Sequence, residues 1–205
     1  MPNKTFISKS EKSAPGFKAT KDRVTLLQCS NASGVIKPLM LYRSFNPRAL
    51  KNQNKDNLPV FWRANKKAWV TSAIFCDWFR KCFVSEVEKQ NLEFKALLLL
   101  GNSPGHPREL ETMHPNIKVS FLLPNTTALL QPMDKGIMQA FKLYYIRIIL
   151  DNMECNPDMN VMECWNNFDI AKCIVNTKES LEKLKPCWKK LWPALTAEND
   201  EESVQ

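Results

Sequence analysis

The feature that most constrains the fold is a short apolar run that ends in a polar turn. Residues 96–100 read Ala-Leu-Leu-Leu-Leu, and the run is stopped by Gly-Asn-Ser-Pro-Gly. This run is far too short to cross a membrane. A strand that is apolar on both faces is typical of a buried, central strand, usually a parallel one. Lys95–Leu100 therefore predicts a strand at the centre of a sheet that is covered by helices.

The remaining elements follow in a mixed order of strands and helices. Arg23–Cys29 and Ile36–Tyr42 are β-prone and flank a turn signal at 31–34, so they predict a hairpin. Apolar residues recur at three- and four-residue steps over Thr71–Glu88, which predicts a helix with Thr71 or Ser72 as its N-cap. The other expected elements are a loop at 45–57, a strand at Ile117–Leu123, and helices from about Asp134 and at Val161–Phe168, Ile170–Leu184 and Cys187–Leu195. This order predicts an α/β fold.

Several classes of protein are disfavoured by composition. The chain has seven cysteines but no Cys-x-x-Cys pair, and its only histidines are His106 and His114. A zinc site and a disulfide framework are therefore not expected. We expect reduced cysteines in an intracellular protein. The first residues, Met-Pro-Asn-Lys, do not resemble a secretory signal.

Positive charge is concentrated in the first third of the chain. Residues 1–67 contain fourteen Lys and Arg against three acidic residues, a net charge of +11. Residues 68–205 contain fifteen against eighteen, a net charge of −3. A concentrated basic segment is typical of proteins that bind the phosphate backbone of nucleic acids, although a basic, solvated surface explains it equally well.

Two stretches of the chain carry a family resemblance. They are LLLLGNSPGHP, at residues 97–107, and FLLPNTTALLQPMDKGIMQAFKLYY, at residues 121–145. Together they resemble the nuclease core of the Tigger proteins, a branch of the pogo group of DNA transposases. TFISKSEKSAPGFKATKDRVTLL near the start and Trp188–Pro193 near the end extend the resemblance to residues 1–195. The resemblance implies a ribonuclease-H-like mixed sheet flanked by helices.

Active members of the family hold two divalent metal ions, such as Mg²⁺, with three aspartates. Such ions lie about 3.5–4 Å apart and stabilise the attacking and leaving oxygens of a phosphoryl transfer. By this resemblance the second aspartate falls on Gly101, the third on Asp134, and the first on a strand upstream of this chain. One of three ligands remains, so we expect no metal or other cofactor, no catalytic residue, and a vestigial role for Asp134. The sheet is expected to lack its first strand.

These observations lead to a set of functional expectations. The leading one is a nuclear, non-catalytic remnant of a transposase that binds DNA without sequence specificity. The expected DNA-binding residues are Lys4, Lys9, Lys12, Lys18, Lys21 and Arg23. The alternative is a protein-interaction module with a partner at an exposed sheet edge, or a little-used product of a decayed element. We expect the nuclease-like domain at 1–155, a helical C-terminal extension at 156–195 and an acidic, disordered tail at 196–205.

Some conspicuous residues are expected to have structural roles. The aromatic residues Trp62, Trp69, Trp78, Phe75, Phe79 and Phe83 are expected in the core and not in a base-stacking surface. His106 is expected to be a hydrogen-bonded loop residue. Asp134 is expected in the first turn of its helix, where the helix dipole favours a carboxylate, and Gln131-Pro132 is expected to shape the entry to that helix.

Overall fold

A computed structural model describes residues 23–31, 34–89, 96–124, 126–155 and 160–191. The strands are β1 (Thr25–Ser30), β2 (Val35–Tyr42), β3 (Phe61–Ala64), β4 (Ala96–Leu100) and β5 (Ile117–Phe121). The helices are α1 (Ser72–Trp78), α2 (Ser85–Lys89), α3 (Thr127–Leu130), α4 (Ile137–Glu154), α5 (Val161–Asn166), α6 (Ile170–Glu182) and α7 (Lys185–Leu191). This mixture of sheets and helices confirms the predicted α/β class, while the ribonuclease-H-like arrangement and the missing first strand stay predictions.

The strands form two small sheets. In the first, of order β1-β2-β3, β1 and β2 make the predicted hairpin and β3 adds parallel to β2. In the second, β4 and β5 pair in parallel. A β-bulge interrupts β1 between Leu27 and Cys29. The short strand β3 was not predicted, and within the described residues the expected single sheet is present as two.

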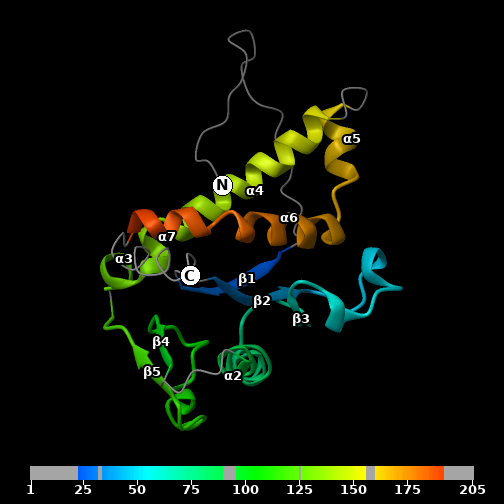
Figure 1. Cartoon of the computed structure of the whole chain (residues 1–205). Coiled ribbons are helices and arrows are strands. Elements are labelled where there is room, and N and C mark those ends of the chain that lie inside the picture. The colour runs from blue at the N-terminus through cyan, green and yellow to red at the C-terminus, as the bar shows by residue number, and fades with distance from the viewer. Residues whose placement is uncertain (1–22, 32–33, 90–95, 125, 156–159, 192–205) are drawn as a thin grey trace, which may run out of the picture.

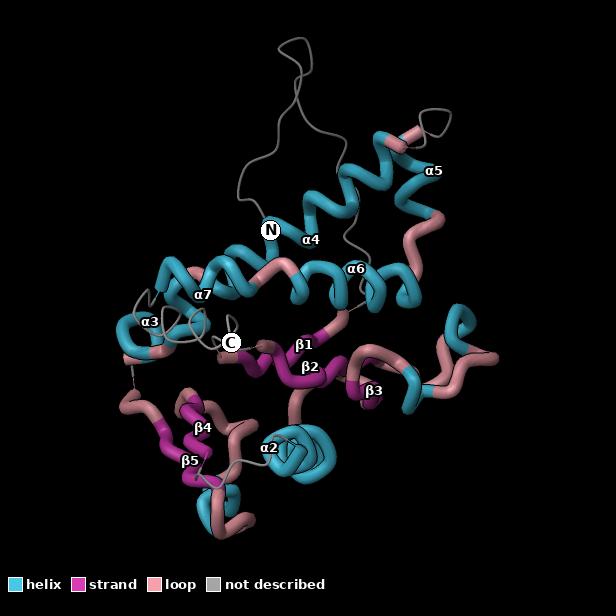
Figure 2. The backbone as a smooth tube through the Cα atoms, viewed as in Figure 1, coloured by secondary structure: helices cyan, strands magenta, loops and turns pink. Residues whose placement is uncertain are grey.

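Helices cover both faces of the first sheet, as Figures 1 and 2 show. Strand β2 explains why this is stable, because alternate side chains of a strand point to opposite faces. Leu39 and Leu41 are buried in one apolar cluster with α1, and Met40 and Tyr42 in another with Ile170 of α6. Helices α4, α6 and α7 lie on the second face, so the C-terminal helices share a core with the sheet.

The predicted helix Thr71–Glu88 is present and packs under the first sheet. The Thr71 hydroxyl accepts a hydrogen bond from the Ile74 backbone N–H at 3.4 Å, which confirms Thr71 as the N-cap. Between α1 and α2 the chain follows a π-helical segment at Phe79–Val84, which was not predicted. The Trp78 indole Nε1–H donates to the Lys37 carbonyl at 2.9 Å and ties the helix to β2. All three phenylalanines of the predicted core cluster are buried here.

Two predictions about individual elements were wrong. Strand Lys95–Leu100 is parallel as expected, but it is not buried on both faces, because Leu97 and Leu99 are 58% and 42% exposed. Asp134 does not begin the long helix: it lies in a 3-10 turn at Pro132–Lys135, and α4 begins only at Ile137. The predicted loop at 45–57 is present and contains two short 3-10 turns, at Arg48–Leu50 and Lys55–Asn57.

The C-terminal helices differ from their predicted bounds by a few residues. The predicted helix Ile170–Leu184 ends at Glu182, and α7 then begins at Lys185, two residues before the predicted start. Lys4, Lys9, Lys12, Lys18, Lys21 and the tail 196–205 lie outside the described residues. Within the described part of the chain, no helix has both the length and the hydropathy that a membrane crossing requires.

Candidate nucleic-acid interface

The first sequence-predicted site is the turn that follows β4. Gly101 is buried at the end of this strand. The His106 ring returns over the turn, and its Nδ1 lies 2.7 Å from the Gly101 carbonyl oxygen. Because a carbonyl only accepts, Nδ1 carries the proton. The ring also packs against Phe75 at 4.8 Å between ring centres. His106 is thus the hydrogen-bonded loop residue that was predicted.

The residues around this turn do not fit a pair of magnesium ions. Gly101 has no side chain, and the Asn102 amide oxygen accepts a hydrogen bond from Arg108 at 3.3 Å. Asp134 is exposed in the turn before α4. Its neighbour Met133 contacts Ser30 of β1. No group of three or more His, Cys, Asp or Glu side chains that could hold a metal ion occurs among residues the structure describes. We therefore derive no metal-dependent step for this chain.

The buried thiol of the first sheet is a poor candidate for an alternative nucleophile. All seven are free thiols. Cys29 on β1 is the most affected by its surroundings, because burial raises its pKa to about 12. A thiol with so high a pKa carries almost no thiolate at neutral pH, and the thiolate is the reactive form.

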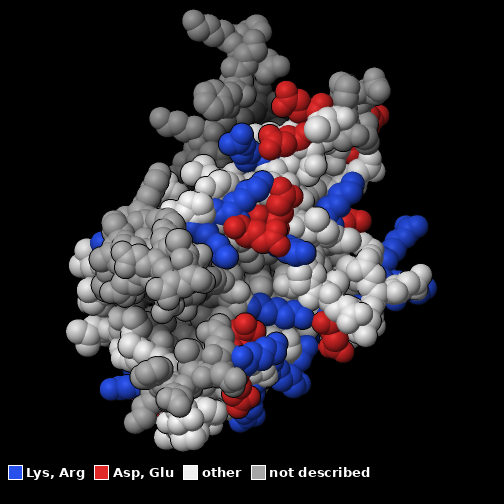
Figure 3. Space-filling model, in the orientation of Figure 1, with Lys and Arg blue, Asp and Glu red and all other residues white. Residues whose placement is uncertain are grey.

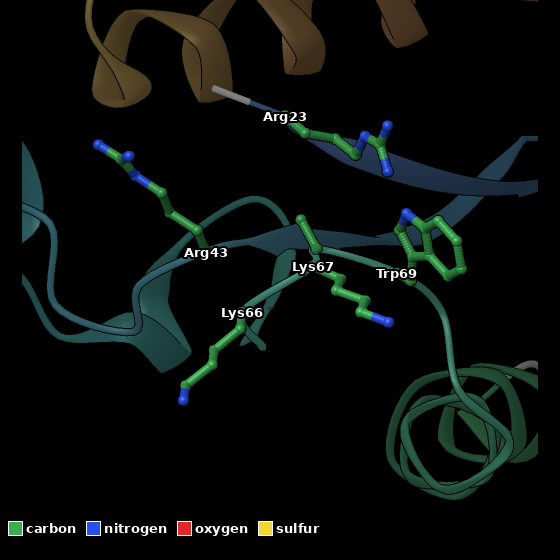
Figure 4. A pocket seen from close by; sticks show the side chains of 6 residues that line it. Arg23, Arg43, Lys66, Lys67 and Trp69 are labelled. Atoms are coloured by element: carbon green, nitrogen blue, oxygen red, sulfur yellow. The ribbon is translucent and has the colours of Figure 1, made fainter. Parts of the chain in front are cut away.

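The second site is a shallow basic pocket at one end of the first sheet (Figure 4). Its volume is about 240 Å³, and its described lining contains four cationic side chains and no acidic one. We call it the basic pocket. It is lined by Arg23, Arg43, Lys66, Lys67, Ala68 and Trp69.

Sheet topology explains why these residues meet. Arg23 precedes β1 and Arg43 follows β2, and the antiparallel register of Thr25 with Leu41 brings these two positions to the same end of the sheet. Strand β3 runs parallel to β2, with Tyr42 beside Ala64, so the loop after β3 reaches that end as well. The Asn65 N–H donates to the Tyr42 carbonyl at 3.1 Å and fixes this loop to β2.

Within the loop, Asn65 holds Trp69 in place by its backbone. The Asn65 side-chain amide donates to the Trp69 carbonyl at 2.7 Å and accepts from the Trp69 N–H at 3.1 Å. Between them Ala68 adopts a φ of 49°, a left-handed conformation that costs a non-glycine residue roughly 1–2 kcal/mol. Trp69 is consequently directed outward, and the residue is 55% exposed. The prediction that Trp69 belongs to the core was wrong, whereas Trp62 and Trp78 are both 1% exposed.

Two of the cations lie against the Trp69 ring. The Arg23 guanidinium carbon is 5.7 Å from the ring centre, and the Lys67 Nζ is 5.5 Å from it. In Figure 4 these two side chains reach toward Trp69, while Arg43 and Lys66 extend away from it. The result is an exposed aromatic ring surrounded by positive charge.

The charge of this pocket differs from that of the C-terminal helices. There, basic and acidic side chains are interspersed (Figure 3). Lys178 pairs with Glu182 at 3.9 Å and Lys183 with Glu179 at 2.8 Å, both on or next to α6. Such pairs neutralise each other locally, so α6 offers little net attraction to an anion. The described lining of the basic pocket contains four cationic side chains and no acidic one.

Sequence reasoning located part of this pocket and missed the rest. Arg23 was among the predicted DNA-binding residues, and it is the one member of that set that the structure describes. Arg43, Lys66 and Lys67 were missed as site residues, although they belong to the basic first third of the chain. The local signal was the polar sequence Asn65-Lys66-Lys67, which sits between two apolar segments as a turn does.

Comparison with known proteins identifies the class to which this fold belongs. A family model described as DDE superfamily endonuclease matches residues 21–188, so the chain belongs to that family. No solved structure gives a significant match.

The relatives narrow the class to the Tigger/pogo type, as the sequence resemblance predicted. The chain is 34% identical to the Jerky protein of Mus musculus, over 89% of this chain and 33% of that protein. It is 36% identical to the Jerky protein homolog of Homo sapiens, over 88% and 33%. It is 32% identical to the human Tigger transposable element-derived protein 7, over 71% and 28%. The chain thus spans about a third of the length of these relatives.

Proposed function

We propose that this domain binds DNA through its phosphate backbone and does not cut it. The basic pocket carries this proposal, because four cationic residues, from before β1, after β2 and after β3, lie at one end of the sheet. Lys and Arg side chains that neutralise phosphates release counterions, which favours binding without reading the base sequence. A protein with this role resides in the nucleus, which fractionation of cells with an antibody against the chain checks.

The non-catalytic part of the proposal is supported by Gly101. Two-metal phosphoryl transfer requires fixed carboxylate ligands on both ions, and a residue without a side chain supplies none. Asp134 is then one remaining carboxylate in an exposed turn. Its role in this chain is structural, within the turn that leads into α4.

Equilibrium binding to a random-sequence duplex tests the DNA-binding proposal. We expect binding at low salt and a steep loss of affinity at higher salt, because phosphate contacts are weakened by counterions. The double variant Lys66→Ala, Lys67→Ala is expected to bind less tightly and to lose affinity less steeply with salt. Lys118→Ala, Lys142→Ala removes the same charge from exposed positions on β5 and α4 and is the matched control. Absence of binding by the unaltered chain at low salt, or equal losses in both variants, overturns the proposal.

A second candidate function is protein interaction, and it is favoured by the face of β4. Leu97 and Leu99 project from alternate positions of this strand and are both largely exposed. Within the described residues β4 pairs with β5 on one side only, so its other edge offers unpaired backbone groups. This function predicts self-association or co-purifying partners that Leu97→Glu, Leu99→Glu abolishes. A stable monomer with a cooperative melt contradicts it.

A further inference from the structure

We propose that the basic pocket binds an unpaired nucleotide of single-stranded DNA, with the base stacked on Trp69 and the phosphate held by the surrounding cations. The inference rests on the proposed function and names the form of DNA that the pocket prefers. It concerns Trp69, a residue that phosphate binding alone does not require.

The exposure of Trp69 is the first observation. Tryptophan is among the largest apolar side chains, and burying it stabilises a fold. Trp62 and Trp78 follow this rule, and each also donates its indole N–H to a backbone carbonyl, Phe45 and Lys37 respectively, at 2.9 Å. Trp69 instead leaves more than half of its surface open to solvent. An exposed aromatic ring is the surface on which bases stack in proteins that bind single strands.

The backbone that presents Trp69 is the second observation. Both polar groups of the Asn65 side chain are used to hold the Trp69 backbone, and Ala68 is kept in a left-handed conformation. Backbone strain of this kind persists only where surrounding contacts enforce it, and it gathers at functional sites. The loop therefore fixes the ring in its exposed position before any ligand arrives, which lowers the entropic cost of binding.

The placement of charge is the third observation. A nucleotide carries its phosphates on the sugar, beside the base and not above it. Arg23 and Lys67 lie over the Trp69 ring, 5.7 and 5.5 Å from its centre. A base that stacks on the ring takes the place of one of these cations, which then remains close enough to turn to the phosphate on the sugar. Arg43 and Lys66 extend outward from the same pocket and can follow the backbone to the next phosphates (Figure 4).

The need for an unpaired base follows from the geometry of the duplex. In a double helix both faces of each base are covered by its neighbours, so a protein ring reaches a face only where the base is unstacked. A duplex can still meet the cations, because its phosphates are on the outside. The pocket therefore predicts that Trp69 matters for single strands and not for duplexes.

The test compares two labelled DNA probes by fluorescence anisotropy at one low salt concentration. One probe is a thymine strand of about twelve nucleotides, within the site sizes of single-strand binders, and the other is a duplex of equal length. Stacking contributes about 1–3 kcal/mol per base, so Trp69→Ala is expected to weaken single-strand binding by about ten-fold and duplex binding by less than about two-fold. Trp69→Phe is expected to retain most of the affinity.

Trp165→Ala is the matched control, because Trp165 on α5 is 54% exposed and does not line the pocket. It should leave both affinities unchanged. A third probe, a strand with abasic positions, should bind the unaltered chain about as weakly as the thymine strand binds Trp69→Ala, and the two losses should not add.

Each failure has a distinct meaning. If Trp69→Ala leaves single-strand binding unchanged while Lys66→Ala, Lys67→Ala weakens duplex binding, stacking is overturned and the proposed function stands. If Trp69→Ala weakens both probes equally, or Trp165→Ala acts as strongly, stacking is also overturned. If the unaltered chain binds neither probe, both proposals fail.

Discussion

Trp69 illustrates how the position of one residue is decided by the backbone around it. Sequence reasoning placed all three of the central tryptophans in the core, because large aromatic residues are mostly buried. Trp62 and Trp78 are buried, because each lies in a regular element with one face on a core cluster. Trp69 lies instead in a loop whose hydrogen bonds and left-handed Ala68 turn its ring outward. A pattern of apolar residues contains no information on such a turn.

Removing the Asn65 side chain is expected to loosen this loop. Asn65→Ala loses both hydrogen bonds to Trp69, which should lower the free energy of unfolding by about 1–2 kcal/mol. Asn65→Asp can keep only the hydrogen bond that it accepts from the Trp69 N–H. Its free energy of unfolding should therefore lie between those of the unaltered chain and Asn65→Ala. Urea denaturation measures the effect, and an Asn65→Ala variant as stable as the unaltered chain contradicts the role of this clamp.

A second residue-scale prediction concerns the ion pair between β3 and α1. Asp77 accepts from Arg63 at 2.7 Å and pairs with Lys81 at 2.8 Å. Burial raises its pKa, but the hydrogen bonds from Lys81 and Arg63 outweigh this, so the pKa of Asp77 is lowered overall. Its stabilising effect is therefore present above the ordinary Asp pKa and is lost as the pH falls through the lowered value.

Comparison with Asp77→Asn isolates this effect. The unaltered chain should be more stable by about 1 kcal/mol at neutral pH, because the pair is partly exposed. The difference should stay constant down to about pH 5 and shrink below about pH 4. Thermal melts over that range measure it. A difference that grows with acidification has the wrong sign for a lowered pKa.

At the scale of elements, the sequence predicted the helices and strands that have a local residue pattern. It missed the strand that forms only by pairing with a distant segment. The helix at 71–88 and the hairpin have clear periodicity or turn signals, and both are present. Strand β3 has only four residues and forms because it pairs in parallel with β2. The end of β2 at Tyr42 lies nineteen residues before the start of β3 at Phe61. No local pattern carries that pairing. The start of α4 was misplaced for a different, local reason, because Gly136 with its φ of 132° separates the 3-10 turn from the helix.

Gly136 is expected to be irreplaceable at the junction before α4. Its φ of 132° lies in a region that side chains rarely adopt, and it separates the 3-10 turn containing Asp134 from the helix. Gly136→Ala should cost about 1–3 kcal/mol of unfolding free energy.

Gly34→Ala is the control, because a methyl group there meets no atom within 4 Å and the backbone is not left-handed. Its effect should be within about 0.5 kcal/mol. Chemical denaturation of the two variants side by side decides the point, and equal effects contradict the role given to the Gly136 backbone.

At the scale of the whole molecule, sequence predicted the fold class and the family but not how the strands divide. Lys95–Leu100 was predicted to be a strand buried on both faces, because four leucines in a row suit such a strand. In the structure Leu98 and Leu100 pack on the helix at 72–89, while Leu97 and Leu99 face outward. Composition shows what a strand could bury; only the arrangement of the other elements shows what covers it.

The basic pocket is likewise a property of the whole molecule. Its cations come from positions before β1, after β2 and after β3, up to forty-four residues apart between Arg23 and Lys67. The charge excess of residues 1–67 predicted that a basic surface exists. It could not predict which residues meet, since antiparallel and parallel pairing together bring them to one end of the sheet.

The central proposal, that this domain holds DNA without cutting it, is tested most directly on one gel. Supercoiled plasmid is incubated with the full chain and Mg²⁺ at low salt, and half of each sample is deproteinised before electrophoresis. We predict retarded migration in the untreated half and intact supercoiled plasmid in the deproteinised half. Open circular product that appears with the unaltered chain and disappears with Asp134→Ala would show metal-dependent cutting and contradict the proposal.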